Sequence, residues 1–254
     1  MIQELFSSSK IYFMFKNQRI IVSKSQNTFI KNENEWKDMR KSFLSEANDA
    51  SSIKSQVAFK DFIEVLVGSN LHSWASCGTL LGLIRDGHLI SWDDDADVDY
   101  LVGEKCKLFS VIVKLSALDF IVIVRPGRLF TSINAFRDGF KCSLGGVRSF
   151  GPYFFSRTTK YPKMFIGNEI RMKFFKQLNT FVPIPELSVK YLQYTYGDWR
   201  TPNHSRSQFD FTRKRSLNGK LVLFALTLID NLGNKRIASQ YMQEIQEFVN
   251  SQRH

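Results

Sequence analysis

The feature that most constrains this chain is a run of five aspartates within the seven residues from Asp93 to Asp99. Neighbouring carboxylates repel one another, and aspartate is unfavourable inside a β-strand. The residues that follow, Tyr100 to Val102, are nevertheless typical of a buried strand. A solvent-exposed acidic turn is the ordinary explanation of such a run. Trp92 and the apolar strand on either side disfavour that explanation here.

Alternation along an extended segment predicts where these carboxylates point. Every second side chain of a strand lies on the same face, so the odd-numbered aspartates from Asp93 to Asp99 are expected to project together. Converging carboxylates are tolerated when a hard divalent cation lies between them, and Mg²⁺ or Mn²⁺ commonly bridges such oxygens to substrate phosphates. The sequence therefore predicts a Mg²⁺ or Mn²⁺ site with Asp93, Asp95 and Asp97 as ligands. An EF-hand fits poorly, because its loop glycine and closing glutamate are missing at the required spacing.

Composition predicts a globular protein. The 254 residues are 43% hydrophobic and 14% aromatic, which is enough for a well-buried core. The three cysteines lie far apart without a CxxC or CxxH pair, so we expect neither a zinc site nor a disulfide framework. Free cysteines indicate a reducing compartment.

No secretory signal is visible, and the longest apolar runs are too short to span a bilayer. We expect a cytoplasmic location, with a peripheral contact to the inner face of the membrane left open.

The net charge of +11 favours polyanionic partners, which include nucleic acid, anionic lipid headgroups and phosphorylated substrates. Charge alone does not choose among these partners, and a basic surface that only maintains solubility is an equal explanation. No RNP, KH or zinc pattern supports a nucleic-acid-binding protein, so no nucleic-acid partner is predicted.

The spacing of apolar residues predicts an α+β protein in two parts, an appendage at residues 1–50 and a domain at residues 51–254. Short β-prone runs on either side of Lys16-Asn17-Gln18 predict a hairpin in the appendage. In the domain, periodicity and turn residues predict helices and an antiparallel meander. The predicted helices are 53–68, 78–84, 104–117, 217–231 and 235–250, and the predicted meander strands are 120–124, 129–136 and 140–144.

A glycine-rich turn precedes the aspartate run by about 15 residues. Gly78-Thr79-Leu80-Leu81-Gly82 follows a predicted strand and opens a helix, where free backbone N–H groups make a seat for phosphate. An ordinary glycine turn would look the same, so this string is weak evidence when taken alone. Arg85, at the end of the helix, is either placed to neutralise phosphate oxygens or is an ordinary exposed cation.

Taken together, these residues resemble the LicD/fukutin family. The family signature is roughly GTLLGxxR, a short gap and then I-P-W-D-D-D-x-D, and the chain matches it at Cys77–Arg85 and Ile90–Val98. A second family block, with YGD followed by Thr-Pro, resembles Tyr196 to Pro202. The resemblance covers about residues 53–215 and leaves residues 1–50 outside it.

The resemblance implies a nucleotidyltransferase-like mixed sheet flanked by helices, with the hairpin appendage before it and helices at the C-terminus. It also implies a metal-dependent phosphotransferase of the LicD type. Such an enzyme moves a phospho-alcohol (phosphocholine, ribitol phosphate or glycerol phosphate) from a CDP-activated donor to the hydroxyl of a glycan or lipid-linked glycan, in the modification of cell-surface polysaccharide. The basic stretch from Gly197 to Lys220, which carries six Lys/Arg against two acids, is then expected near the mouth of the site.

Residue by residue, the resemblance assigns Asp95 and Asp97 to the catalytic metal pair, with Asp93 as a further ligand. It assigns Gly78 and Thr79 to the turn that meets the donor phosphates, and Arg85 to the family arginine. Asp99 stands where the family has a small residue, and either Asp97 or Asp99 is a candidate general base.

The chain departs from the family pattern at Ser143, where a downstream strand normally carries an aspartate. Either another acid, Asp138, Asp99 or Glu169, takes that role, or the chain is a catalytically weakened binding module of glycan assembly. A nucleotidyltransferase that uses a nucleoside triphosphate is a further alternative, because it would share the same metal site.

Overall fold

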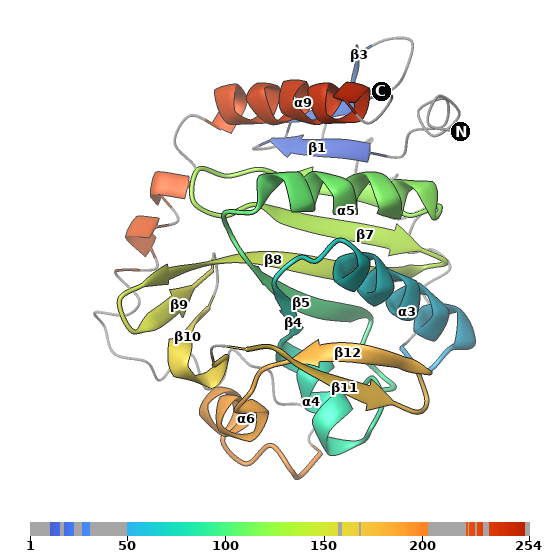
Figure 1. Ribbon diagram of the computed structural model, residues 1–254, viewed down its shortest axis with the longest axis vertical. Helices are drawn as coiled ribbons and strands as arrows, with labels where there is room; N and C mark the ends of the chain where they lie inside the picture. The colour runs from blue at the N-terminus through green and yellow to red at the C-terminus, as the bar shows by residue number, and fades with distance from the viewer. Residues whose placement is uncertain are drawn as a thin grey trace.

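The computed structural model describes residues 11–15, 18–22, 27–30, 50–156, 159–167, 169–202, 222, 224–226, 228–230 and 234–251, the first three ranges by their backbone alone. It shows an α+β fold in which helices pack against a large mixed sheet (Figure 1). The described helices are α3 (Ile53–Gly68), α4 (Cys77–Arg85), α5 (Lys105–Ala117), η1 (Lys163–Phe165), α6 (Ser188–Tyr196) and α9 (Asn234–Ser251). The described strands are β1 (Ile11–Phe15), β2 (Gln18–Val22), β3 (Asn27–Ile30), β4 (Ser73–Ala75), β5 (Asp95–Leu101), β6 (Ile121–Arg125), β7 (Ser132–Arg137), β8 (Phe140–Phe150), β9 (Tyr153–Phe155), β10 (Lys160–Pro162), β11 (Arg171–Phe175) and β12 (Thr180–Ile184).

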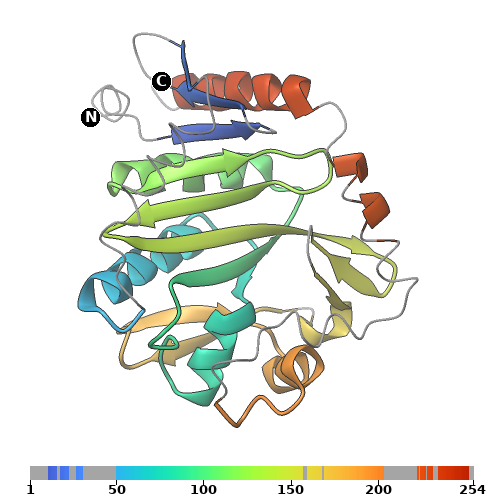
Figure 2. The same ribbon diagram turned by 180° about the vertical axis from the view of Figure 1, so that it is seen from behind.

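The main sheet runs in the order β10-β9-β8-β7-β6-β1-β2-β3, with β5 beside β8 and β4 beside β5. β5 and β8 are parallel, as are β1 and β6, and the other pairs are antiparallel. A second, two-stranded sheet is formed by β11 and β12. Figure 2 shows β5, β8, β7 and β6 in front with α3 and α5 behind them, so these two helices cover the same face of the sheet.

Helical spacing of large apolar residues explains why the covering helices bury one side. α3 begins at Ser52, whose hydroxyl accepts the Ser55 N–H at 3.1 Å, and it buries Phe59, Phe62, Ile63 and Leu66. α5 buries a comparable stripe, which consists of Leu108, Phe109, Val111, Ile112 and Leu115. These two stripes and the apolar side of the sheet form the core.

Most of the predicted elements are confirmed, α3 with the bounds that its periodicity indicated. The hairpin of β1 and β2 is also confirmed, and β1 additionally pairs with β6 in the main sheet. A domain boundary at residue 50 stays a prediction. The predicted helix at 217–231 lies largely outside the described residues. None of the described helices has the length and apolar content needed to cross a bilayer.

The second glycine of the GTLLG string fixes α4 against the loop that leads into the aspartate run. A Cβ at Gly82 would lie 2.6 Å from the carbonyl oxygen of His88 and 2.8 Å from the backbone nitrogen of Ile90. Contacts this close are with backbone, so a larger residue would push the helix and the loop apart. The same loop is closed by the Asp93 N–H, which donates to the Ile90 carbonyl at 3.0 Å.

We therefore expect Gly82→Ala to lower the free energy of unfolding by roughly 1–3 kcal/mol, the usual cost of forcing an extra methyl into a filled space. Gly68→Ala is the matched control, because a Cβ at Gly68 meets nothing within 4 Å in α3. That change should be neutral or stabilise the protein by up to about 1 kcal/mol. Urea unfolding followed by circular dichroism measures both values, and equal midpoints for the two variants would contradict the close backbone approach.

Candidate active site

In strand β5, the side chains of the aspartates lie on one face of the strand. Its even-numbered residues, Ala96, Val98 and Tyr100, are at most 1% exposed and anchor the strand in the core. The odd-numbered aspartates of β5 therefore share the opposite face, as the alternation predicted. The apolar anchors explain why a strand forms here despite the poor β propensity of aspartate.

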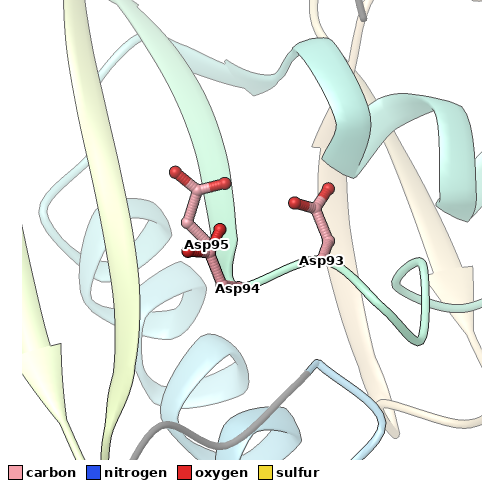
Figure 3. A group of neighbouring side chains, drawn as sticks. All are labelled: Asp93, Asp94 and Asp95. Atoms are coloured by element: carbon pink, nitrogen blue, oxygen red, sulfur yellow. The ribbon is translucent and has the colours of Figure 1, made fainter. Parts of the chain in front are cut away.

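Asp93 lies before the strand and reaches the site from the side of α4. A Cβ at Gly78 would lie 2.6 Å from Oδ2 of Asp93, so only glycine leaves room for this carboxylate beside the first turn of the helix. Figure 3 shows Asp93 and Asp95 projecting to the same side of the connecting segment. Carboxylate oxygens of Asp93, Asp94 and Asp95 all lie within 4.8 Å of one another.

These three carboxylates fit a hard divalent cation, because their oxygens converge closely enough to be shared by one ion. The group differs in one member from the predicted set, since it contains the exposed Asp94 in place of Asp97. A bend before β5 causes this difference, because it places Asp94 and Asp95 together. The assignment of Asp93, Asp95 and Asp97 as metal ligands stays a prediction.

Two hydrogen bonds of the Asp97 backbone fix the start of α4 against β5. The Asp97 N–H donates to Oγ1 of the buried Thr79 at 2.7 Å, and the Ser76 N–H donates to the Asp97 carbonyl at 3.0 Å. Thr79 therefore accepts a hydrogen bond from the strand, which sets the position of the glycine turn relative to the carboxylates. The donor-phosphate role of Gly78 and Thr79 stays a prediction.

Burial and mutual repulsion shift the pKa values of these acids upward. Burial, followed by the charges of Asp95 and Asp99, raises the pKa of Asp97 to about 8. Burial and the charges of Asp95 and Asp94 raise the pKa of Asp93 to about 6. Ionisation of these acids is therefore unfavourable in the folded protein, and a bound cation would favour it.

Lys141 is a site residue that the sequence did not predict. It lies opposite Asp95 in the parallel pairing of β5 and β8, and its Nζ is 2.5 Å from Oδ2 of Asp95. Burial lowers the pKa of Lys141, but the carboxylates of Asp95, Asp97 and Asp94 together outweigh this effect and raise the pKa overall. The sequence did contain a signal for this residue. Lys141 lies in the apolar stretch Phe140–Leu144 and two residues before Ser143, so the two side chains are on the same face of the strand.

Ser143 occupies the place beside Asp97 in the neighbouring strand, because the two residues are paired in register. Of the three acids considered as replacements, Asp99 lies on the same face of β5. Asp138 lies in the turn before β8, where its carboxylate is 3.7 Å from Arg137, and Glu169 is exposed between η1 and β11. Asp99 is therefore the one of these three that belongs to the site.

The Asp99 carboxylate is buried between the Tyr161 hydroxyl and the backbone of Gly145. Its Oδ2 accepts a hydrogen bond from the Tyr161 hydroxyl at 2.8 Å, and a Cβ at Gly145 would lie 3.0 Å from its Oδ1. Burial raises the pKa of Asp99 to about 7, although the hydrogen bond from Tyr161 opposes the shift. A carboxyl group with this pKa is suited to general base chemistry near neutral pH.

Helix α6 closes the site with two buried tyrosines. The ring of Tyr191 lies 5.2 Å from that of Tyr161, in an edge-to-face arrangement. Burial raises the pKa of Tyr196, and the nearby carboxylates of Asp97, Asp93 and Asp95 add to this effect. Tyr196 belongs to the predicted YGD block, whereas Tyr161 was missed because only the tertiary fold brings it to Asp99.

Arg85 is not brought together with the carboxylates. It ends α4, about 12 Å along the helix axis from Cys77 at 1.5 Å per residue. Its guanidinium donates to both carboxylate oxygens of Asp86, at 2.8 and 2.7 Å, and its side chain is only 9% exposed. A role in donor binding stays a prediction for this residue.

A cleft of about 330 Å³ opens over the same strands. Asp97 and Asp99 border it at one end, together with Ser76 and Cys77 from the start of α4. Its floor crosses β8 and β7 and reaches Arg125 at the end of β6. The cleft therefore connects the carboxylates with an arginine on the far side of the sheet face.

The raised carboxyl pKa values predict that metal-free protein loses stability as the pH rises. Because the pKa of Asp97 is higher in the folded protein than in the unfolded chain, ionisation of Asp97 destabilises the folded state. The contribution of Asp97 to stability is complete below the ordinary aspartate pKa of about 4 and is lost as the pH rises through about 8. In EDTA we expect the melting temperature to fall between pH 5 and pH 8.5. Asp97→Asn should flatten this dependence and melt higher than the wild type at pH 8. Thermal melts at each pH are the measurement, Asp138→Asn is the exposed control, and an unchanged slope in Asp97→Asn would refute the interpretation.

Comparison with known proteins agrees with this geometry. Residues 70–132 match the model of the LicD/FKTN/FKRP nucleotidyltransferase domain, a span that includes α4 and the aspartate run. No curated protein matches the chain in sequence.

Among solved structures, the chain is similar to a crystal structure of ANT(2″)-Ia in complex with adenylyl-2″-tobramycin. The sequence identity is 10% and the TM-score is 0.39, and the match covers 78% of this chain and 96% of that chain. It is similar at the same identity and TM-score to a solution structure of the antibiotic-resistance factor ANT(2″)-Ia, over 90% of that chain. The low TM-scores place no individual residues. Residues 70–132 of the chain are therefore similar to the LicD/FKTN/FKRP nucleotidyltransferase domain.

Proposed function

We propose that the protein transfers a phospho-alcohol from a CDP-activated donor to a hydroxyl of a glycan or lipid-linked glycan, and that the reaction depends on Mg²⁺ or Mn²⁺. The similarity of residues 70–132 to the LicD/FKTN/FKRP nucleotidyltransferase domain supports a phosphotransferase or nucleotidyltransferase role. The observation that carries the proposal is the array of carboxylates on β5, which lies directly beside the glycine turn that opens α4. Acids for a cation and backbone N–H groups for phosphate are the two components that phosphoryl transfer requires.

In this proposal, Asp93, Asp95 and Asp97 hold the cation, with Asp94 available as a further oxygen ligand. The cation supplies charge neutralisation for the diphosphate of the donor. The N–H groups of the first turn of α4, at Gly78 and Thr79, receive phosphate oxygens. Lys141 holds Asp95 in place and limits the net negative charge of the cluster.

Asp99 serves as the general base. The acceptor hydroxyl gives its proton to the Asp99 carboxylate while its oxygen bonds to the phosphorus of the phospho-alcohol. The bond from that phosphorus to the bridging oxygen of the diphosphate breaks, and CMP leaves with the electron pair. Tyr161 positions Asp99, because its hydroxyl holds Oδ2 and thereby fixes the direction of Oδ1.

Contact with the membrane and a cytoplasmic location belong to the same proposal. Of the basic stretch from Gly197 to Lys220, residues 203–220 lie outside the described residues. Its excess of cations supports binding to an anionic acceptor or to the lipid surface that carries the acceptor.

The proposal is tested by CMP release from a panel of CDP-alcohols, with Mg²⁺, Mn²⁺ or EDTA. We expect release that needs the metal and falls by at least about 100-fold in Asp95→Asn, since even groups that only support a metal ligand contribute 10–100-fold. Asp138→Asn is the control, because this acid lies in a turn outside the site. Release that persists in EDTA, or full turnover by Asp95→Asn, would rule out the metal cluster.

Two observations favour a catalytically weakened binding module as the second candidate. Ser143 stands beside Asp97 in place of an acid, and Lys141 already neutralises Asp95. Such a module would bind CDP without releasing CMP from any donor in the panel. A nucleotidyltransferase would instead release pyrophosphate from a nucleoside triphosphate, so the same assay with triphosphates separates all three functions.

A further inference from the structure

We propose that the cleft beside the carboxylates binds an acceptor that itself carries an acid group, and that Arg125 pairs with this group. This inference rests on the proposed function and names the chemical class of its acceptor. Arg125 is exposed at the end of β6 and borders the same cleft as Asp97 and Asp99. Arginine matches phosphate and carboxylate groups by paired hydrogen bonds.

Strand register places Arg125 and Asp99 at opposite ends of one row. Asp99 pairs with Gly145 of β8, Gly145 pairs with Ser132 of β7, and Ser132 pairs with Arg125 of β6. Three strand spacings of about 4.8 Å separate the two end positions, which corresponds to about 14 Å between backbones. Because Gly145 has no side chain, the Asp99 carboxylate lies over it, with Oδ1 3.0 Å from where a Cβ would stand, and this carboxylate forms the β5 end of the row.

A parallel row adds hydrogen-bonding groups. Asp97 pairs with Ser143, and Ser143 pairs with Asn134, so a hydroxyl and an amide follow the carboxylate along the floor. Ser156 and Thr159 border the cleft from the segment between β9 and β10. The aromatic residue among those that line the cleft, Phe130, is only 1% exposed and offers no face for stacking a base. This lining suits a polyhydroxylated ligand better than a nucleobase.

Charge fixes the orientation of such a ligand. Its anionic group is repelled by Asp97 and Asp99 and attracted by Arg125, so the anion lies at the β6 end and a hydroxyl lies at the β5 end. The glycine turn of α4 lies on the other side of β5, next to β4. Ser76 and Cys77 at the start of α4 border the same end of the cleft as Asp97 and Asp99, so donor phosphates at the glycine turn and the hydroxyl of the acceptor would meet beside these carboxylates.

The test compares binding of glycerol 3-phosphate and glycerol, the smallest polyol pair that differs by an acid group. Protein saturated with CDP and Mg²⁺ is titrated by NMR, so that the donor side is already filled. We expect the wild type to bind glycerol 3-phosphate at least about tenfold more tightly than glycerol, the scale of a charge-assisted hydrogen bond. Arg125→Ala should abolish this preference, and Arg125→Lys should retain part of it.

Arg128→Ala is the matched control, because this exposed arginine lies three residues further along and borders a different cavity. It should keep the preference for glycerol 3-phosphate, and melting curves establish that each variant is folded. The inference is overturned if the wild type shows no preference, if Arg125→Ala keeps it, or if Arg125→Ala weakens CDP binding instead. Failure of the proposed function has a different signature, since the wild type would then neither bind CDP with Mg²⁺ nor release CMP.

Discussion

The repulsion among the carboxylates of β5 is the constraint on which the rest of the site depends. Burial of Ala96, Val98 and Tyr100 holds the strand in place, although ionisation of the aspartates opposes folding. The hydrogen bond from the Asp97 N–H to Thr79 then fixes α4 relative to that strand. Ionisation of these aspartates is unfavourable in the fold, and the ammonium group of Lys141 beside Asp95 offsets part of the repulsion.

Local features of the sequence predicted the components of the site that are close together along the chain. Alternation between Asp95 and Asp99 depends only on the strand period of two, and the GTLLG turn depends only on a strand followed by a helix. The inclusion of Asp94 in the carboxylate group was not predictable, because it depends on a bend that precedes the strand. The position of Arg85 also required the structure, since its pairing with Asp86 follows from the end of α4.

Residues contributed by distant strands could not be predicted, because strand register is set by the tertiary fold. Lys141 reaches Asp95 through the parallel pairing of β5 with β8, and the crossover between these strands contains a helix and two further strands. Tyr161 reaches Asp99 from β10. Arg125 shares a row with Asp99 only because β7 and β8 lie between them. Each of these side chains is unremarkable in the sequence.

Ser143 of β8 stands where the family pattern has an aspartate, and Asp99 of β5 is the acid that could take its role. The two positions differ in where they lie on the sheet. Ser143 pairs with Asp97 in register, so a carboxylate at position 143 would lie on the same face of the sheet as Asp97. Asp99 keeps the strand face but lies one row further along, beside Gly145 and under the hydroxyl of Tyr161. Asp99 therefore lies one row further from the carboxylates of Asp93, Asp94 and Asp95 than position 143 does. In the proposed reaction this displacement suits a base that receives a proton from an acceptor, and it leaves metal binding to the acids before and at the start of β5.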